Sequence, residues 1–333
     1  MSGVFQATGS RPARSREEGF GLDVIAAACR APSTHNTQPW SWRVDGTTVE
    51  LYAEPARRLV HADPDGRNLA ISCGAALHHA QVAARGLGWR PTVVRWPRGP
   101  DTDLVARVDL EPCSRTADDL TLLRALHERR TDRRRFTAWP VQGARLDRLV
   151  DVARASGAEA VSLCDVVERV RLEHLVARAH AAQSADPALV AEHRAWTDRS
   201  ATDGVPCEVV PPSDPDLPSR RTRFTGGTLP DRERDVDTTD GVVVLCGDSD
   251  DRASWVTTGE ALGALWLRAV ADGLSVVPLS QVIEVDETRS ALQDDLLFGL
   301  AVPHLLLRVG WLPIGRDDLP PTPRRPLRDV LRR

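Results

Sequence analysis

The chain has 333 residues, a formal net charge of −4 and 41% hydrophobic residues, which is enough apolar content for one large domain or two smaller ones. The small negative charge gives no reason to expect nucleic acid as a partner, and no apolar run approaches the length of a membrane span. The sequence contains no lysine, so every cationic contact with an anion falls to arginine or histidine.

Cysteine usage and the N-terminal composition indicate a reduced, cytoplasmic protein. Six cysteines are scattered without a C-x-x-C pair, and Cys29 and Cys246 follow apolar runs. His78 and His79 are adjacent and therefore face different sides of a helix, so no metal site is expected. Residues 1–19 are rich in Gly, Ser and Arg, which predicts a mobile tail rather than a signal peptide.

Hydrophobic periodicity predicts alternating helices and strands along the chain. The expected helices span Leu22–Arg30, Leu69–Arg85, Thr116–Arg130, Leu146–Ala155, Val166–Ala182 and Gly259–Gly273. The expected strands span Thr48–Tyr52, Thr92–Trp96, Leu104–Leu110, Gly241–Gly247 and His304–Trp311. Residues 187–240 differ, because Pro, Asp, Arg and Gly dominate them and no period is sustained, which indicates a functional or disordered insert.

The most informative stretch is Ala31–Trp40, which reads APSTHNTQPW. Pro32 and Pro39 bracket it and fix the local backbone. Hydroxyl and amide groups suited to the edge of a heterocycle come from Ser33, Thr34, Asn36 and Gln38. Trp40 could stack on a flat ring. The residues alone fit equally well a surface loop whose Ser and Asn side chains make turn contacts.

A weak internal repeat suggests two related halves. GAALHHAQVAARGLGWRP, which starts at Gly74, echoes GEALGALWLRAVADGLSVVP, which starts at Gly259. Each copy reads as an apolar helix, a Gly-Leu break and a strand. The Gly-Leu pairs align only after a two-residue shift, so the repeat alone is suggestive.

APSTHNTQPW resembles the APS-x-x-N-x-QPW signature of FMN-dependent nitroreductases, and most closely that of their Acg-type branch. The resemblance implies an α+β nitroreductase-like fold. In that fold two pseudo-symmetric halves, 20–115 and 116–331, are fused so that one chain imitates the nitroreductase homodimer. It implies FMN as the cofactor, contacted by Ser33, Thr34, Asn36, Gln38 and Trp40. The resemblance assigns no catalytic residue and leaves open a monomer or a homodimer.

Three further stretches resemble cofactor-binding segments of this family. The run from Arg130 to Arg134 resembles the R-x-S-x-R phosphate segment, with one extra Arg before Phe136, so Arg130 and Arg134 are expected to bind first, then Arg133. GLSVVPLSQ resembles the turn whose backbone N–H groups face flavin N5, which assigns Pro278, Leu279, Ser280 and Gln281. Arg324 and Arg325 resemble the terminal basic pair near the phosphate. Without the family, these stretches fit a solvated face, a plain helix-to-strand turn and a basic tail.

The distribution of these motifs predicts one intact site per chain. The first half keeps APSTHNTQPW, whereas the second keeps RRTDRRRF and PLSQ. At the second half's signature position, ARASGAEAVSLCD lacks the Asn and the QPW. In a nitroreductase dimer these elements come from different subunits, so the resemblance implies one complete site and one lost site.

Two functions follow from the resemblance. One is reduction of a nitroaromatic, quinone or similar acceptor with NAD(P)H through FMN. The other is sequestration of FMN under a lid with little turnover. The insert at 187–240 is the candidate lid, because Arg220, Arg221, Arg223 and Phe224 can pair with anions and stack. A disordered linker far from the site is the alternative.

Overall fold

The computed structural model describes residues 16–212, 223–224, 226–231, 240–315 and 317–332. The strands are β1 (Trp40–Asp45), β2 (Thr48–Ala53), β3 (Trp89–Arg95), β4 (Leu104–Pro112), β5 (Glu159–Leu163), β6 (Gly241–Gly247), β7 (Ser275–Pro278) and β8 (Val302–Gly310). The long helices are α1 (Arg16–Ala28), α2 (Arg67–Leu87), α3 (Ala117–Glu128), α4 (Gly143–Ala155), α5 (Val166–Ala185), α6 (Pro187–Ala195), α7 (Arg252–Ala271) and α9 (Asp286–Asp295). Short helices are η1 (Thr34–Asn36), η2 (Pro55–Arg57), η3 (Cys207–Val209), α8 (Gln281–Glu284) and α10 (Leu327–Val330).

The strands form two four-stranded antiparallel sheets with the same topology. The first has the order β1-β2-β4-β3 and the second the order β5-β6-β8-β7. In each, a helix precedes the first strand and a long helix connects the second strand to the third. The order helix, two strands, long helix, two strands from α1 to β4 therefore repeats from α4 to β8, where α5, α6, α8 and α9 are added between the strands. We call these segments the first and second halves. The fold is α+β, as the sequence predicts.

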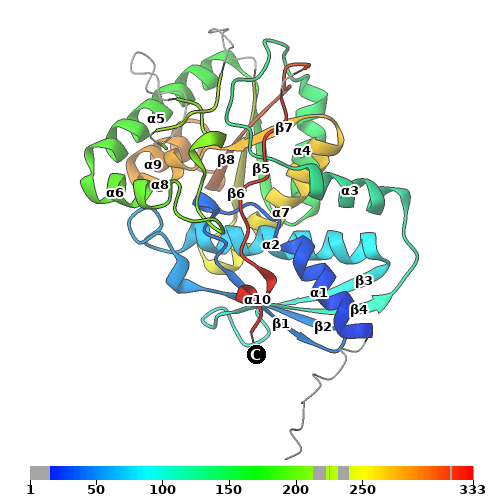
Figure 1. Cartoon of the computed structure of the whole chain (residues 1–333). Helices are drawn as coiled ribbons and strands as arrows, with labels where there is room; N and C mark the ends of the chain where they lie inside the picture. Colours follow the sequence, from blue (N-terminus) through cyan, green and yellow to red (C-terminus); the bar gives the residue numbers. More distant parts are fainter. Residues whose placement is uncertain (1–15, 213–222, 225, 232–239, 316, 333) are drawn as a thin grey trace, which may run out of the picture.

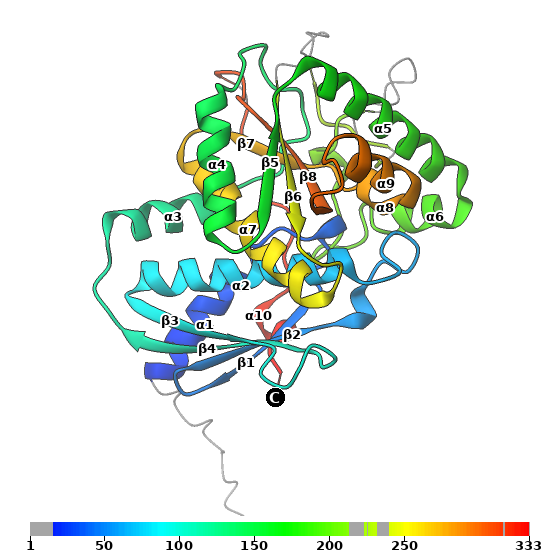
Figure 2. The ribbon, with the colours of Figure 1, turned by 180° about the vertical axis from the view of Figure 1, so that it is seen from behind.

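The layers differ between the halves (Figures 1 and 2). Strand β6 is buried along its whole length, because both faces of the second sheet are covered. Val243 and Leu245 belong to the main core, which includes α7, whereas Val242 and Val244 pack against α5, α8 and α9. By contrast, β3 alternates between half-buried and exposed residues, as a strand does when one face meets solvent.

Helices α2 and α7 cross at the centre of the molecule, where two glycines let their backbones touch (Figure 1). A Cβ atom on Gly74 would lie 2.1 Å from the carbonyl oxygen of Val256, and one on Gly259 would lie 2.1 Å from that of Ile71. Both helices end at a left-handed glycine, Gly88 or Gly273. The same number of residues separates Gly74 from Gly88 and Gly259 from Gly273, so the repeat aligns without a gap at these glycines.

Several elements differ from the sequence prediction. Residues 187–240 do not lack structure throughout, because Asp186 caps α6 through its side chain and a proline opens the helix. Helix α1 begins at Arg16, inside the segment predicted as a tail, and the residues before it lie outside the described part. Strands β1 and β5 and helix α9 were not predicted either. Strand β1 follows a polar loop, β5 has only five residues and α9 is mostly polar, so none of them has a strong hydrophobic pattern.

The end of the chain returns from the second half to the first (Figure 1). Leu331 forms a parallel bridge with Trp42, and the backbone N–H of Arg332 donates to Trp42 O at 2.7 Å. The final segment therefore packs on β1.

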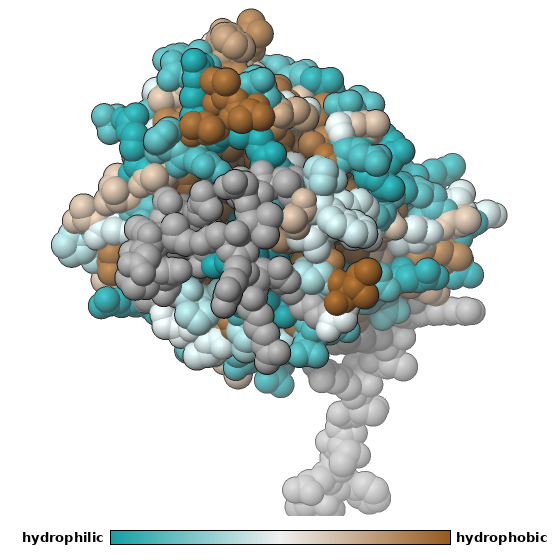
Figure 3. Space-filling view, turned by 90° about the horizontal axis from the view of Figure 1, so that it is seen from above, coloured by the Kyte–Doolittle hydropathy of each residue, from teal (hydrophilic) through white to brown (hydrophobic). Residues whose placement is uncertain are grey.

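Among the described helices, none combines the length and apolar character needed to cross a membrane. On the face shown in Figure 3, hydrophobic side chains lie in small groups between hydrophilic ones.

Candidate functional site

The loop after α1 holds an unusual backbone. His35, Asn36 and Gln38 have positive φ angles of 49°, 55° and 48°, in the left-handed region that non-glycine residues rarely adopt. The backbone N–H of Gln38 donates to Ser33 Oγ at 2.9 Å, which helps to close the turn. Such strain persists where surrounding contacts enforce it, and it is frequent at binding sites.

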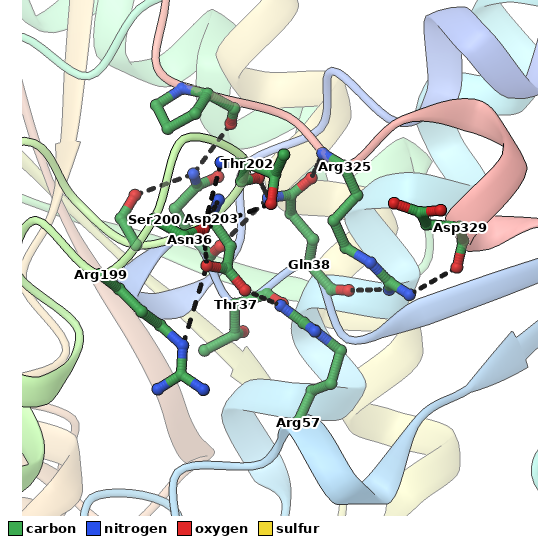
Figure 4. Close-up of polar contacts among 12 residues, drawn as sticks. Asn36, Thr37, Gln38, Arg57, Arg199, Ser200, Thr202, Asp203, Arg325 and Asp329 are labelled. Carbon is green, nitrogen blue, oxygen red and sulfur yellow. Dashed lines mark hydrogen bonds and ion pairs between the residues drawn. The ribbon is translucent and has the colours of Figure 1, made fainter.

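The amides of Asn36 and Gln38 fasten this loop to two distant segments (Figure 4). Asn36 Nδ2 donates to Gly204 O and Pro323 O, both at 2.9 Å. Gln38 Nε2 donates to Thr202 O at 2.8 Å, and Gln38 Oε1 accepts from the backbone N–H of Arg325 at 2.8 Å. These side chains are engaged within the protein, and Trp40 is fully buried in the core. Their contact with a cofactor stays a prediction.

A cavity of about 110 Å³ lies between the two halves, several times the space that one water needs. It unites the loop after α1 with α2, α7, the turn after β7 and the insert. Its lining residues are Pro32, Ser33, Thr34, His35, Asn68, Ile71, Ser72, Thr131, Arg133, Arg223, Phe224, Leu262, Trp266, Val277, Pro278, Leu279, Ser280, Gln281 and Leu305. We call it the ring cavity. Half of the residues predicted from sequence meet here: Ser33, Thr34, Arg133, Pro278, Leu279, Ser280 and Gln281.

The ring cavity is electropositive, since no aspartate or glutamate lines it among the described residues. Burial, followed by the charge of Arg223, lowers the pKa of Arg133 to about 10, and Arg133 Nη1 has no partner in the described chain. Arg223 is paired instead: it donates to both carboxylate oxygens of Glu284 and to Ser280 Oγ. Burial raises the pKa of Glu284, but the charge and hydrogen bonds of Arg223, together with hydrogen bonds from Ser280 and Gln183, hold that pKa below its ordinary value.

A second, smaller cavity of about 30 Å³ shares Thr131 with the ring cavity. Four guanidinium groups line it, from Arg30, Arg129, Arg130 and Arg324, and its remaining walls come from Val209 and residues 319–322. We call it the arginine cavity. No carboxylate among the described residues lines it.

The arginines of this cavity are poorly compensated. Burial, followed by the charges of Arg324, Arg130 and Arg30, holds the pKa of Arg129 well below its ordinary value. Burial and Arg30 lower the pKa of Arg324 to about 10. Arg129 Nε and Nη1 have no partner in the described chain, although its guanidinium lies 4.7 Å from the Trp266 ring. Uncompensated buried cations with free donors fit an anion, and phosphate above all.

In the structure, the arginine pair that fits the motif and lines the cavities lies one residue earlier in the run than predicted, at Arg129 and Arg133 instead of Arg130 and Arg134. Arg129, Thr131 and Arg133 line the cavities, as does Arg130. Arg134 does not: it is buried, donates to Asp132 Oδ2 at 2.7 Å and reaches Asp317 O at 3.0 Å. Arg325 also lies outside both cavities and donates to Glu54 and the carbonyls of Gln38 and Trp40. Binding roles for Arg134 and Arg325 stay predictions.

Sequence reasoning missed His35, Trp266, Arg30 and Arg129. Arg30 lies directly before the signature, and Arg129 opens an R-x-T-x-R spacing that matches the family segment better than Arg130 does. Trp266 lies on the helix that its apolar sequence identified as central, and that position is the signal that could have identified Trp266 as a site residue. Arg223 and Phe224, predicted as part of a lid, do line the ring cavity, whereas Arg220 and Arg221 lie outside the described residues.

The corresponding place in the first half is occupied by an ion pair. The spacing of the paired glycines makes Arg95 the counterpart of Ser280, and Gln81 the counterpart of Trp266. Arg95 donates to both carboxylate oxygens of Glu260, and Gln81 Nε2 donates to Glu260 at 2.7 Å. Within the described residues, the ring cavity is therefore the site that complementary motifs of both halves assemble.

The protein is expected to lose stability in acid. Burial lowers the pKa of His78, His193 and His304 from 6.5 to about 4. Their stabilising effect is complete above pH 6.5 and is lost as pH falls toward 4, because the unfolded chain then binds more protons. Burial raises the pKa of Asp63 from 3.8 to about 6, which acts in the opposite direction but involves one group. Thermal unfolding should therefore give a lower Tm at pH 5 than at pH 7.5, and an equal or higher Tm at pH 5 contradicts this.

Comparison with known proteins gives the family. No family model matches the chain. A Mycobacterium tuberculosis (strain H37Rv) protein named as a candidate NAD(P)H nitroreductase is 39% identical over 311 residues, covering 92% of this chain and 90% of the relative. Another from the same organism, named as the candidate NAD(P)H nitroreductase acg, is 31% identical over 317 residues, covering 92% and 93%.

Among solved structures, the chain is similar to the FMN-dependent nitroreductase NfnB from Mycobacterium smegmatis in complex with NADPH. The TM-score is 0.43 at 15% identity, over 64% of this chain and 97% of that chain. The two relatives match nearly the whole chain and carry the assignment. The chain therefore belongs to the NAD(P)H nitroreductase family that includes acg.

Proposed function

We propose that the protein binds FMN and uses NAD(P)H to reduce a small acceptor, such as a nitroaromatic compound or a quinone. The observation that carries this proposal is the pair of joined cavities. One is lined by Trp266, aliphatic side chains and the turn after β7; the other is lined by four arginines. A flat ring linked to a phosphate matches this pair, because the first cavity suits the ring and the adjoining arginine cavity suits the phosphate.

The buried polar atoms without partners test this fit. Arg129 Nε and Nη1 and Arg30 Nε are donors available to a phosphate. Arg133 Nη1 is the donor available to the ring system, whose charge becomes more negative on reduction. When bound, FMN supplies the hydride and electron transfer. The residues of this chain hold it, exclude water and present their donors at fixed positions.

We further propose that part of the insert covers the ring cavity. Phe224 is buried, and its ring meets His35 edge-on at 4.9 Å and Arg133 at 5.0 Å. The ion pair of Arg223 with Glu284 fixes the neighbouring position. A cover here slows bulky hydride donors, which is the property that separates rapid turnover from storage of flavin. The names of the relatives favour turnover.

The expected cofactor content is one FMN per chain, because Arg95 and Glu260 occupy the corresponding place in the first half. Absorbance of the purified protein and mass spectrometry of the released cofactor measure this content. Two flavins per chain, FAD, or failure to take up FMN contradict the proposal.

Anaerobic mixing with NADPH, NADH and dithionite then tests turnover and access. An enzyme loses its flavin absorbance with at least one nicotinamide. A covered site reacts faster with dithionite than with the bulkier NADPH. No reduction by either nicotinamide excludes the proposed reaction.

A further inference from the structure

His35 lines the ring cavity and has no task in the proposed binding of FMN. Its side chain is only 4% exposed, and neither ring nitrogen has a hydrogen-bond partner in the described chain. Two other buried histidines, His79 and His304, differ in this respect. His79 Nδ1 lies 2.9 Å from Ala75 O, and His304 Nδ1 lies 2.8 Å from Thr258 Oγ1. Buried polar groups are nearly always satisfied, so a histidine with two free nitrogens at a cavity wall indicates a ligand contact.

The position of the imidazole is fixed from both sides. The His193 ring stacks on it with centroids 4.9 Å apart and planes at 28°, and the Phe224 ring meets it edge-on at 4.9 Å. The backbone holds His35 at φ 49°, a conformation that only surrounding contacts can maintain. The ring is therefore preorganised before any ligand enters.

The charges around His35 determine what it can do. Burial, then Arg223, His193 and Arg133, holds its pKa well below the ordinary value, so the imidazole is neutral at physiological pH. A neutral imidazole offers one N–H donor and one acceptor. It is a very weak acid, so its contribution is a hydrogen bond to an oxygen that gains negative charge, without proton transfer.

Resting on the proposed function, we infer that His35 is a catalytic residue that donates a hydrogen bond to the acceptor. The substrates it favours are planar molecules whose oxygen is conjugated with the reducible centre, as in nitroarenes and quinones. Acceptors reduced by electron transfer at a distance, such as ferricyanide, gain nothing from this contact. His35 thereby distinguishes two classes of oxidant at one site.

Two variants that both suit the left-handed backbone test this inference. Glycine and asparagine tolerate positive φ, but only asparagine keeps an N–H donor. The FMN-loaded proteins are reduced anaerobically with dithionite, and reoxidation by menadione, nitrofurazone and ferricyanide is followed separately. In His35→Gly, the rate ratio of menadione to ferricyanide is expected to fall about tenfold or more, since loss of one aimed donor costs at least that much.

His35→Asn should recover part of that ratio, which a merely structural role does not predict. His180→Gly on α5, outside both cavities, serves as the matched control. An unchanged ratio in His35→Gly, or an equal fall in both His35 variants, overturns the inference while leaving the proposed function standing. A parent protein that takes up no FMN or is not reoxidised by any acceptor overturns both.

Discussion

Gly74→Ala is expected to lower the free energy of unfolding by about 3 kcal/mol or more, at the upper end of overpacking effects. The added Cβ would lie 2.1 Å from Val256 O and 2.9 Å from Gly259 Cα. Both are backbone atoms of α7, so no side chain can rotate away and the helices must separate. Chemical denaturation followed by circular dichroism measures the change.

The matched control is Gly143→Ala at the start of α4. A Cβ atom added there would meet no heavy atom of the described chain within 4 Å, and Gly143 is not among the residues with positive φ. This variant should be neutral or stabilised by up to about 1 kcal/mol. If both variants unfold at the same denaturant concentration, the close crossing of α2 and α7 does not limit stability.

Arg129→Met is expected to weaken FMN binding by one to two decades and, at the same time, to stabilise the protein without FMN. A charge-assisted contact with phosphate is worth about 1.5–3 kcal/mol, and about 1.4 kcal/mol corresponds to one decade. Arg129 is buried among Arg30, Arg130 and Arg324, and its Nε and Nη1 lack partners in the described chain. Methionine removes that uncompensated charge but keeps apolar contact with Trp266.

The two measurements are the dissociation constant, from fluorescence titration of FMN, and the Tm of the flavin-free protein. Arg90→Met provides the control for loss of one positive charge, because Arg90 is exposed on β3 and pairs with Glu111. Opposite changes in affinity and stability identify a group kept for its ligand. A loss of stability together with unchanged affinity means that Arg129 is structural.

The sequence was sufficient for the fold class and for four segments that line the ring cavity: the loop after α1, the arginine run, the turn after β7 and part of the insert. Helices α2 and α7 were predicted as helices but not as walls of the cavity. The apolar periodicity of α2 and α7, and the turn after β7, are local signals, and each was readable from residues close together. The roles of Asn36 and Gln38 were not readable. Amide side chains at these positions look the same in the sequence whether their hydrogen-bond partners belong to a ligand or to Gly204 and Pro323.

The arginine cavity shows the same limit for charge. Arg30 and Arg129 are 99 residues apart, and Arg129 Nη2 donates directly to Arg30 O. The return of the final segment adds Arg324, which donates to Cys29 O and Arg30 O. In the sequence, an arginine that will be solvated cannot be distinguished from one that will be buried. Only the tertiary structure therefore shows that Arg130 lines a cavity and Arg134 does not. The capped helix α6 was missed for another reason, since a local start signal at Asp186 was outweighed by the composition of the stretch that follows.

The return of the final segment also sets an order of events during synthesis. Arg324 Nη1 donates to Asn36 Oδ1 at 3.0 Å, across 288 residues of sequence. The loop that carries the family signature leaves the ribosome early, but its restraints from Pro323 and Arg324 arrive much later in synthesis. Until then the strained backbone of that loop lacks part of what holds it. Firm retention of the cofactor is therefore expected only once residue 324 has left the ribosome, and a nascent chain stalled before that residue should retain flavin less well.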